Sequence, residues 1–553
     1  PHLLRFSLQN IRFRPPRDAP EGRWSVHLAG RFRRDAPAMR RTDRMTPGSA
    51  SPPGAEIVPD SAPDRAAPMD DQLPRFPSAA CLIDGVWRPA HRGGAFAVVN
   101  PSTDEVVGAA ADAGAEEANA ALDAAAAALP RWRETPGPER AAALRRWAAA
   151  LGRHREELAH LLTLEQGKPL LESRGEIDYA RSFFDFAAGE AERLGGELIP
   201  ASTAGKRLLV LRPPVGVCAA ITPWNFPAAM VARKLAPALA AGCTMVLKPA
   251  EQTPLTALAL ASLAEGAGVP AGVVNVVTGD AERIGSAFFA HGAVRKVSFT
   301  GSTEVGRLLI ERSAPNIVRL ALELGGHAPL IVFDDADLAR ALDGAIASKF
   351  RNGGQTCICA NRFYVQESIH DAFVAGLRER VAALRVGDGR DPTTQIGPLI
   401  DDAALRKVEA HVADATARGA RATVGGGLVE IPGLARRFHA PTVLEGATPE
   451  MLVLREETFG PVAPVVRFRD EVEAIALANS LPFGLAAYFF TRDASRLLRV
   501  AEALEFGVLG ANDAMPSTAQ APFGGMRHSG YGREGGREGV LAFTETKYLC
   551  WGL

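Results

Sequence analysis

Between residues 217 and 321, short apolar runs alternate with longer stretches whose apolar residues recur at helical spacing. The apolar runs are residues 217–221, 244–247, 273–277 and 296–299, and the helical stretches between them are 227–241, 254–267 and 281–290. Parallel strands need a long crossover connection, usually a helix, so this alternation predicts βαβ units. We therefore predict an α/β protein with a doubly wound parallel sheet, which binds ligands at the carboxyl ends of its strands.

Distinctive residues follow the predicted strands at those ends. They are Trp224 and Asn225 after the first run, Lys248 and Glu251 after the second, Gly279 after the third, and Gly301 and Ser302 after the fourth. Gly301 also begins a G-x-x-x-x-G segment, a spacing that by itself marks a plain helix start as readily as a nucleotide site. Here the segment follows a strand and opens a helix, whose free N–H groups and dipole favour a pyrophosphate.

A second distinctive segment contains Cys357. This cysteine lies in a glycine-rich turn after an amphipathic run at residues 338–350, and Glu323 precedes it beside a pair of glycines. A lone cysteine is more often a small buried apolar residue than a reactive one. Glycines, however, let a ligand approach the backbone closely, and a thiolate is a strong nucleophile near neutral pH.

Composition limits the class of protein. A chain of 553 residues is too long for one hydrophobic core, so two or three domains are expected. The net charge of −1 gives no reason to expect nucleic acid or an anionic membrane as a partner, and no apolar run approaches the ~20 residues that span a bilayer. The six cysteines do not resemble a disulfide framework, which favours a cytoplasmic protein, and no Cys/His spacing resembles a metal site.

Residues 1–80 differ from the rest. Residues 1–44 contain eleven arginines and four acids, and the following part is rich in proline, alanine and serine, without sustained periodicity. Such composition predicts a disordered extension. It is open to two interpretations, an organelle transit peptide or a start site placed too far upstream of Met45 or Met69.

The two segments around Glu323 and Cys357 resemble the active-site signatures of the aldehyde dehydrogenase superfamily, L-E-L-G-G at 322–326 and F-x-N-x-G-Q-x-C-x-x-x-x-R at 350–362. Further segments resemble family motifs in family order, at 221–227, 248–251, 299–306, 456–461 and 522–525. The resemblance covers about residues 81–553. It implies an NAD-binding domain at 81–323 with an oligomerisation arm at 198–214, and a catalytic domain at 324–510. Residues 511–553 would return to the NAD-binding domain and the arm, in a homodimer or homotetramer.

The resemblance also implies the chemistry. Cys357 would attack the aldehyde to give a thiohemiacetal, which loses hydride to the nicotinamide. Glu323 would activate water to hydrolyse the resulting thioester. The Asn225 side chain and the Cys357 backbone N–H would donate hydrogen bonds to the oxyanion. An acyl-CoA-forming dehydrogenase would not need Glu323, and a non-catalytic binding protein on the same fold would be expected to lose one of these three residues.

The residues implied to bind the cofactor lie at the predicted strand ends and near Glu457. They are Thr222, Pro223, Trp224, Asn225, Lys248, Pro249, Ala250, Glu251, Gly301, Ser302, Leu324, Glu457 and Phe459. Lys248 and Glu251 would bind the adenosine ribose hydroxyls, and Glu457 the nicotinamide ribose. Because a carboxylate at position 251 would repel a 2′-phosphate, NAD is predicted rather than NADP.

The small-molecule substrate is predicted from two arginines, Arg233 and Arg351. Either one alone is readily explained as a structural or solvated residue, but two near one nucleophile suit an aldehyde with a distal carboxylate, which arginine binds in a bidentate fork. With Ser517 as a third donor, they resemble the succinate-semialdehyde dehydrogenase branch. The segment at 512–517 departs from that branch, and its Pro516 fixes φ and removes a donor just before Ser517, which leaves glutarate or 2-oxoglutarate semialdehyde open. Cys359 is expected to be either a packed neighbour of Cys357 or its partner in a reversible disulfide.

Overall fold

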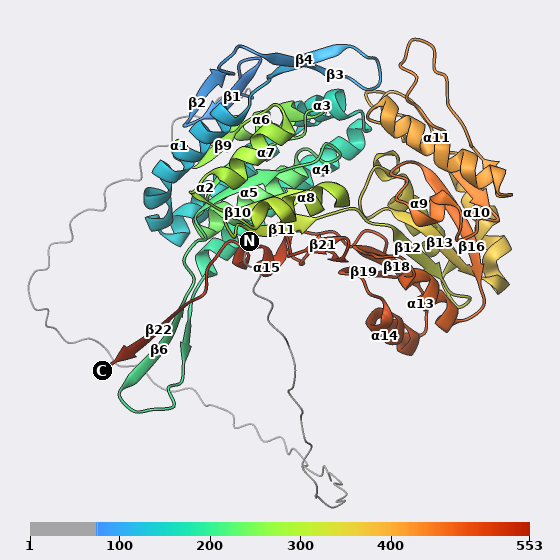
Figure 1. The fold of residues 1–553 in the computed structure, drawn as a ribbon. Coiled ribbons are helices and arrows are strands. Elements are labelled where there is room, and N and C mark those ends of the chain that lie inside the picture. The colour runs from blue at the N-terminus through green and yellow to red at the C-terminus, as the bar shows by residue number, and fades with distance from the viewer. Residues whose placement is uncertain (1–72, 75) are drawn as a thin grey trace, which may run out of the picture. The chain divides into compact units, whose positions relative to one another are not determined.

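The computed structural model describes residues 73–74 and 76–553, so the expectations for residues 1–80 lie almost entirely outside the described residues. Two sheets organise the described part of the chain (Figure 1). The first is eight-stranded, in the order β2 (Val86–Pro89), β1 (Ala80–Ile83), β9 (Val274–Val276), β8 (Thr244–Lys248), β7 (Val217–Ile221), β10 (Val294–Thr300), β11 (Arg319–Glu323) and β21 (Gly530–Tyr531). Its central strands, β9 to β11, are parallel, as predicted.

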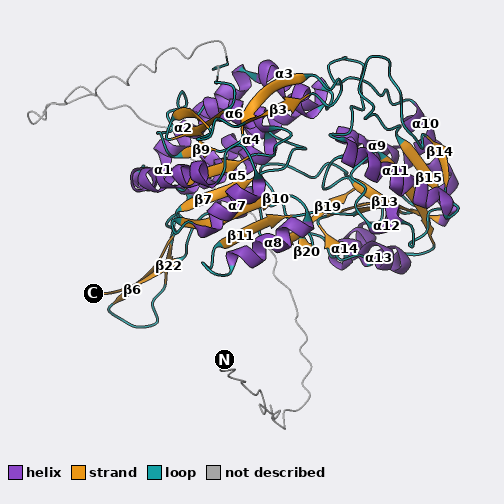
Figure 2. Cartoon of the chain, turned by 45° about the horizontal axis from the view of Figure 1, so that its top comes forward, coloured by secondary structure: helices purple, strands orange, loops and turns teal. Residues whose placement is uncertain are grey.

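The first sheet is buried on both faces. Val217 and Ala219 of β7 pack into one hydrophobic cluster, while Cys218 and Ala220 pack into another on the opposite face. This alternation follows from the pleat of a strand, which turns successive side chains to opposite sides. Helices lie on either side of the sheet (Figure 2), which explains why its strands read as continuous apolar runs.

The helices of this region are α1 (Ala115–Glu134), α2 (Gly137–Arg153), α3 (Arg155–Gln166), α4 (Leu170–Arg193), α5 (Ala229–Ala241), α6 (Pro254–Ser262), α7 (Ala281–Ala290), α8 (Thr303–Ser313) and α15 (Gly536–Leu541). The predicted bounds of β7 and α7 are confirmed. Helix α5 begins two residues later than predicted, because the N–H groups of Ala228 and Ala229 bond to Glu176 of α4. Helix α6 ends earlier than predicted, in tight turns that lead to Gly268.

The second sheet has seven strands, in the order β14 (Arg421–Val424), β15 (Thr442–Glu445), β16 (Val462–Phe468), β13 (Ala360–Gln366), β12 (Ala328–Val332), β18 (Ala486–Phe490) and β19 (Val508–Ala511). Its helices are α9 (Leu338–Phe350), α10 (His370–Ala382), α11 (Asp402–Ala417), α12 (Leu452–Arg455), α13 (Glu471–Asn479) and α14 (Ala494–Ala503), with short 3-10 turns at Arg351–Gly354 and Glu367–Ile369. The bounds of α9 match the amphipathic run at 338–350. Alternate residues of β12 and β18 again face two separate clusters.

Three strands form an arm that extends from the first sheet's region (Figure 1). They are β22 (Lys547–Gly552), β6 (Lys206–Leu211) and β5 (Glu197–Ile199), which pair in antiparallel fashion. Two small two-stranded antiparallel sheets complete the strands, β3 (Ala95–Val99) with β4 (Val106–Ala111), and β17 (Phe483–Gly484) with β20 (Met526–Arg527). The C-terminal strand β22 pairs with residues 206–211, which lie within the segment predicted as the oligomerisation arm, and the role of that arm in assembly stays a prediction.

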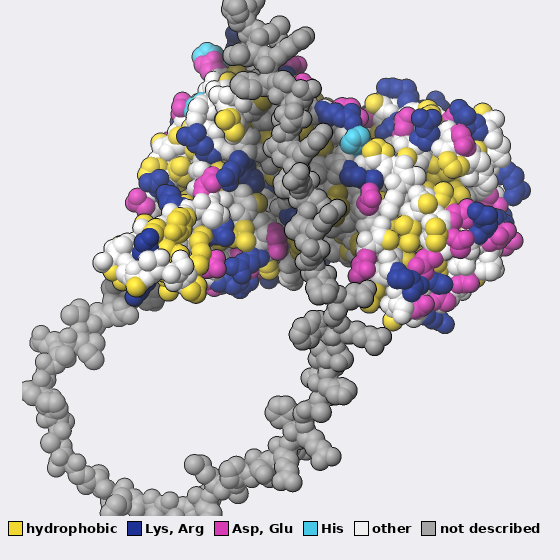
Figure 3. All heavy atoms as spheres, turned by 60° about the horizontal axis from the view of Figure 1, so that its bottom comes forward, with side chains coloured by type: hydrophobic (Ala, Val, Ile, Leu, Met, Phe, Trp, Pro, Cys, Tyr) yellow, Lys and Arg dark blue, Asp and Glu magenta, His cyan; other side chains and the backbone are white. Residues whose placement is uncertain are grey.

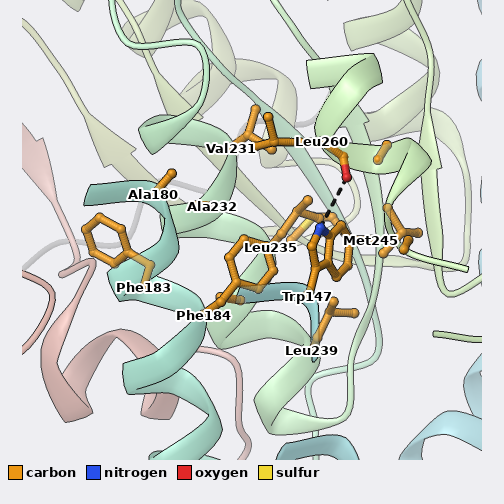
Figure 4. Packing of buried hydrophobic residues seen from close by; sticks show 14 of the residues in the cluster. Trp147, Ala180, Phe183, Phe184, Val231, Ala232, Leu235, Leu239, Met245 and Leu260 are labelled. Atoms are coloured by element: carbon orange, nitrogen blue, oxygen red, sulfur yellow. Dashed lines mark hydrogen bonds between the residues drawn. The ribbon is translucent and has the colours of Figure 1, made fainter. Parts of the chain in front are cut away.

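Helix α5 is buried along its whole length. Figure 4 shows Val231, Leu235 and Leu239 of this helix packed beside Phe184 of α4 and Trp147 of α2, whose indole N–H donates to the Leu260 carbonyl at 3.1 Å. This packing fixes α5 against α4. It thereby also fixes the positions of Arg233 and Lys234, two cationic residues of α5 that are buried.

Three general properties of the described residues bear on function. No helix among them is both long and apolar enough to cross a lipid bilayer. Among the same residues, no group of three or more histidine, cysteine, aspartate or glutamate side chains is arranged to hold a metal ion. The six cysteines are free thiols.

Candidate active site

The turn that carries Cys357 depends on left-handed backbone conformations. After α9 ends, Asn352 and Gly353 have φ values of 51° and 61°. Glycine and asparagine are residues that adopt this region readily. Gly354 is also required, because a Cβ atom there would lie 2.2 Å from the Gly460 carbonyl oxygen. The glycines of the motif therefore allow the cysteine turn to pack closely against the segment around Gly460.

Cys357 lies between two cavities. It borders one of about 390 Å³, at the carboxyl ends of the first sheet's strands, and one of about 310 Å³, walled by α4 and α5. Phe226 and Met230 border both cavities as well. One thiol is thus open to two separate binding spaces, as a reaction between two bound molecules requires.

The electrostatics of the site keep the Cys357 thiol protonated at neutral pH. Burial raises the pKa of Cys357 to about 12, the Glu457 carboxylate adds to the rise, and Arg233 opposes it. Burial also raises the pKa of Glu457, to about 7. Since the thiolate is the reactive form, chemistry at Cys357 requires a group that takes the thiol proton.

Glu323 ends strand β11 and is 4% exposed. Burial and the neighbouring Glu534 carboxylate raise the pKa of Glu323 well above its usual value, while Arg233 and Lys234 oppose the rise. Its Oε2 atom has no hydrogen-bond partner among the described residues. Glu323 interacts electrostatically with Cys357, yet it borders neither cavity. The structure brings these two residues near each other without placing the carboxyl group in a cavity wall.

Asn225 is tied to the cysteine turn. Its side-chain Nδ2 donates to the Gln355 carbonyl at 3.0 Å. Its own carbonyl accepts from Lys168 Nζ at 2.7 Å and from Asn352 Nδ2 at 3.0 Å. Asn225 and Cys357 border the same cavity. The Asn225 amide group is therefore fixed in the wall of the cavity that Cys357 also borders, and a fixed hydrogen-bond donor requires such anchoring.

Most of the predicted cofactor residues border the larger cavity. These are Pro223, Trp224, Asn225, Gly301, Ser302, Leu324, Glu457 and Phe459. The rings of Trp224 and Phe459 meet edge to face, with centroids 5.5 Å apart. Glu457 accepts a hydrogen bond from the Gly326 N–H at 3.2 Å, which fixes its carboxylate beside the Glu323 motif.

The remaining predicted cofactor residues, Thr222, Lys248, Pro249, Ala250 and Glu251, lie outside that cavity wall, at the ends of β7 and β8. The Thr222 N–H donates to the Lys248 carbonyl at 3.1 Å, which joins the two strand ends. Lys248 Nζ donates to Glu251 Oε1 at 2.6 Å, with the lysine buried and the carboxylate partly exposed.

The residues that precede α8, Gly301 and Ser302, border the larger cavity. Ser302 caps the helix by accepting from the Val305 N–H at 3.3 Å. Gly306 lets α8 pack against Leu324, because a Cβ atom there would lie 2.6 Å from the leucine methyl groups. By their chemistry, the N–H groups of a helix N-terminus suit the pyrophosphate of a dinucleotide, and an ammonium donor with a carboxylate acceptor, as in Lys248 and Glu251, suits ribose hydroxyls.

The smaller cavity brings together all three predicted substrate residues, Arg233, Arg351 and Ser517, with Cys357. Arg233 is 2% exposed and lies over the Phe523 ring at 3.9 Å. Its Nη2 donates to Ser517 Oγ at 3.3 Å. The Arg351 guanidinium lies 5.3 Å from the Phe226 ring centre, and its Nε has no hydrogen-bond partner among the described residues.

Four further residues of the site were not predicted from the sequence. Glu172, Glu176 and Tyr179 of α4 border the smaller cavity, and Lys168 precedes the same helix. Both acids are engaged: Glu176 with Lys168 Nζ at 2.7 Å, and Glu172 with the Asn352 N–H at 2.7 Å. Their spacing along α4 places them on one helix face, a signal that polar residues at 172, 176 and 179 did carry.

The Cys359 thiol makes contacts of its own with residues other than Cys357. Its thiol lies 3.6 Å from Lys349 Nζ and 3.4 Å from Asn361 Oδ1, and it is buried. Lys349 in turn donates to Asn361 at 2.8 Å. These contacts describe a packed neighbour.

Comparisons with known proteins agree with this geometry. A model of the aldehyde dehydrogenase family matches residues 87–549. The chain is 54% identical over 472 residues to "Succinate-semialdehyde dehydrogenase [NADP(+)]" of Escherichia coli (strain K12), covering 85% of this chain and 97% of that protein. It is 53% identical over 468 residues to "Glutarate-semialdehyde dehydrogenase" of Pseudomonas putida, covering 85% and 96%.

Solved structures give the same result. The crystal structure of an NADP-dependent enzyme from E. coli superposes with a TM-score of 0.85 at 54% identity, covering 86% of this chain and 98% of that one. The fold is therefore that of an aldehyde dehydrogenase, with mixed α/β sheets. The chain belongs to the aldehyde dehydrogenase family.

Proposed function

We propose that this enzyme oxidises an aldehyde with a carboxylate at its far end, succinate semialdehyde first of all, to the dicarboxylic acid with reduction of NAD. The observation that supports this most directly is the smaller cavity, where Arg233, Arg351 and Cys357 share one space of about 310 Å³. Two guanidiniums there match a carboxylate, and the relatives from E. coli and P. putida are named for semialdehydes of this kind.

In this proposal the chain's residues act in sequence. Cys357 loses its thiol proton to solvent water and its sulfur forms a bond to the aldehyde carbon, whose carbonyl π electrons move to the oxygen; the Asn225 side chain and the Cys357 backbone N–H stabilise the resulting oxyanion. A nicotinamide cofactor, when bound, supplies the hydride acceptor. Glu323 then takes a proton from the water that hydrolyses the thioester, which releases the acid and restores the thiol.

The substrate proposal predicts a selective defect when Arg351 is replaced by leucine. The kcat/KM for succinate semialdehyde should fall about 10- to 100-fold, because one charge-assisted contact is lost. The kcat/KM for butanal should hardly change. Arg351 is the cleaner test, since Arg233 also contacts Glu534 and other groups in the core.

NADH formation with succinate, glutarate and 2-oxoglutarate semialdehydes and butanal provides the measurement. Arg340→Leu, an exposed arginine on α9, is the matched control and should behave as wild type. Equal losses of kcat/KM for butanal and for the semialdehydes would show that Arg351 supports the structure of the site and does not bind the substrate carboxylate. If the kcat/KM of the wild-type enzyme is highest for glutarate semialdehyde, that aldehyde replaces succinate semialdehyde as the proposed substrate.

For the cofactor, we propose NAD over NADP on the basis of Glu251. The carboxylate of Glu251 is bound to Lys248, so the lysine charge is already partly neutralised where a 2′-phosphate would lie. The E. coli relative is named for NADP, so the choice between NAD and NADP needs a direct test at Glu251. Replacing Glu251 by serine should raise the NADP-to-NAD ratio of kcat/KM about tenfold or more.

Initial rates with each cofactor at saturating aldehyde measure this ratio. Glu265→Ser, an exposed acid in the same part of the chain, should leave it unchanged. A wild-type enzyme that already prefers NADP would contradict the role given to Glu251.

The domain division and the assembly follow the same reasoning. We assign the first sheet, residues 81–323, to cofactor binding and the second, residues 324–510, to catalysis, with 511–553 returning to the first.

The arm exposes Leu198, Tyr548, Leu549 and Trp551. Figure 3, which brings the lower side of Figure 1 forward, shows hydrophobic side chains exposed among charged ones on this face. We propose that a second copy of the chain covers the arm in a dimer or tetramer, in the reducing cytosol to which free thiols are suited.

A further inference from the structure

Tyr179 of α4 joins two of the proposed carboxylate-binding residues. Its hydroxyl lies 2.6 Å from Ser517 Oγ and accepts from Arg233 Nη2 at 3.1 Å. The same Arg233 nitrogen donates to Ser517 Oγ at 3.3 Å, so the three groups form a closed triangle in the wall of the smaller cavity. These residues are far apart in the chain. Tyr179 and Arg233 meet because α4 packs against α5 (Figure 4), and Ser517 reaches them from the segment after β19.

The hydrogens of this triangle can be counted. Arg233 only donates, so both hydroxyl oxygens act as acceptors toward it. The two hydroxyls have one hydrogen each, and the bond between them uses one of the two. Within the described part of the chain, neither hydroxyl donates to any group outside the triangle. One hydroxyl hydrogen therefore remains for an acceptor in the cavity.

Tyr179 decides which hydrogen remains. A phenol O–H is more acidic than an aliphatic O–H, which favours the bond that runs from Tyr179 to Ser517 and leaves the serine hydrogen for the cavity. The Tyr179 ring is held by Phe183, with ring centres 4.8 Å apart. Among the described residues, the hydrogen bonds of Ser517 itself are those to Tyr179 and Arg233. Pro516, directly before it, has no N–H to donate.

We propose that Tyr179 is a specificity-determining residue, which fixes Ser517 and Arg233 so that the serine hydroxyl and the guanidinium together receive the distal carboxylate of the substrate. The proposal rests on the semialdehyde function proposed above. Tyr179 acts by positioning, at the end of the cavity that binds the carboxylate, and takes no part in the bond changes at Cys357.

The test is Tyr179→Phe, which keeps the ring and its packing on Phe183. The KM for succinate semialdehyde should rise about 3- to 10-fold with little change in kcat, because a hydrogen bond that serves binding alone is lost. Butanal kinetics and the melting temperature should stay close to wild type. Tyr364→Phe, which removes a buried hydroxyl outside both cavities, is the matched control and should leave both substrates unaffected.

A double-mutant cycle makes the test sharper. If Tyr179 acts through Ser517, then Tyr179→Phe combined with Ser517→Ala should raise the KM for the semialdehyde no further than Ser517→Ala alone. Fully multiplicative effects would overturn the positioning role. An unchanged KM for the semialdehyde in Tyr179→Phe, or equal losses with both aldehydes, would also overturn it. In either case the proposed function would still stand if the wild-type enzyme prefers the semialdehyde to butanal. A wild type that does not prefer the semialdehyde over butanal would overturn both.

Discussion

Replacing Cys357 by alanine should abolish the NADH burst as well as turnover, with kcat reduced roughly 10⁴-fold or more. No covalent adduct forms without the sulfur, so hydride transfer has no starting compound. Rapid mixing of enzyme, cofactor and aldehyde, followed by NADH absorbance, measures the burst directly. The variant should fold normally, because the thiol borders cavities and supports little packing.

The neighbouring thiol provides the control. Cys359→Ala should retain a stoichiometric burst, since the Cys359 sulfur contacts Lys349 and Asn361. Inactivation by peroxide that dithiothreitol reverses should also occur equally in this variant, if Cys359 is only a packed neighbour. A burst that disappears in Cys359→Ala and persists in Cys357→Ala would exchange their roles.

Glu323→Gln should fail at the later step. The thioester should form at a nearly normal rate, giving one equivalent of NADH, and then hydrolyse about 10²- to 10⁴-fold more slowly for lack of a general base. Quenched samples should contain acyl-enzyme, which mass measurement detects as an added mass on the peptide that contains Cys357. Normal steady-state turnover in this variant would remove Glu323 from its role, and a missing burst would move that role to the first step.

The pH dependence gives a second view of Glu323. Burial and Glu534 raise the pKa of Glu323, so its ionised fraction increases as the pH rises toward that pKa. A base acts in its ionised form, so hydrolysis of the thioester should accelerate with increasing pH and level off above the pKa of Glu323. In Glu323→Gln this rise should be absent from single-turnover deacylation rates. The structure adds a condition, because the carboxyl group borders neither cavity and has to approach the thioester to act.

Several features of the fold and the site were predicted from the sequence because they depend on local signals. The alternating runs predicted β7 and α7 with their observed bounds, and the amphipathic run at 338–350 predicted α9. The glycine segment after β10 predicted the start of α8, where Ser302 is the cap. In each case the side chains that decide the structure are neighbours in the chain, at a spacing of two or of three to four residues.

The boundaries that the sequence did not predict depend on distant partners. Helix α5 begins at Ala229, where Glu176 of another helix accepts hydrogen bonds from the N–H groups of Ala228 and Ala229. No periodicity within residues 227–241 contains that information. The same applies to the cofactor residues, which divide into a group in the cavity wall and a group around the Lys248–Glu251 pair.

The sequence by itself determined the parallel sheet, and it was enough to single out Cys357 as the proposed nucleophile and Arg233 and Arg351 as the proposed substrate residues, since each is marked by local pattern or motif. Only the tertiary structure decided that Tyr179, Arg233 and Ser517 share one cavity and one set of hydrogen bonds. It also decided that Glu323 is buried with a raised pKa, beside Glu534. The physical reason is the same in both cases: contacts between remote segments, and the loss of water around a charge, exist only once helices and sheets have packed together.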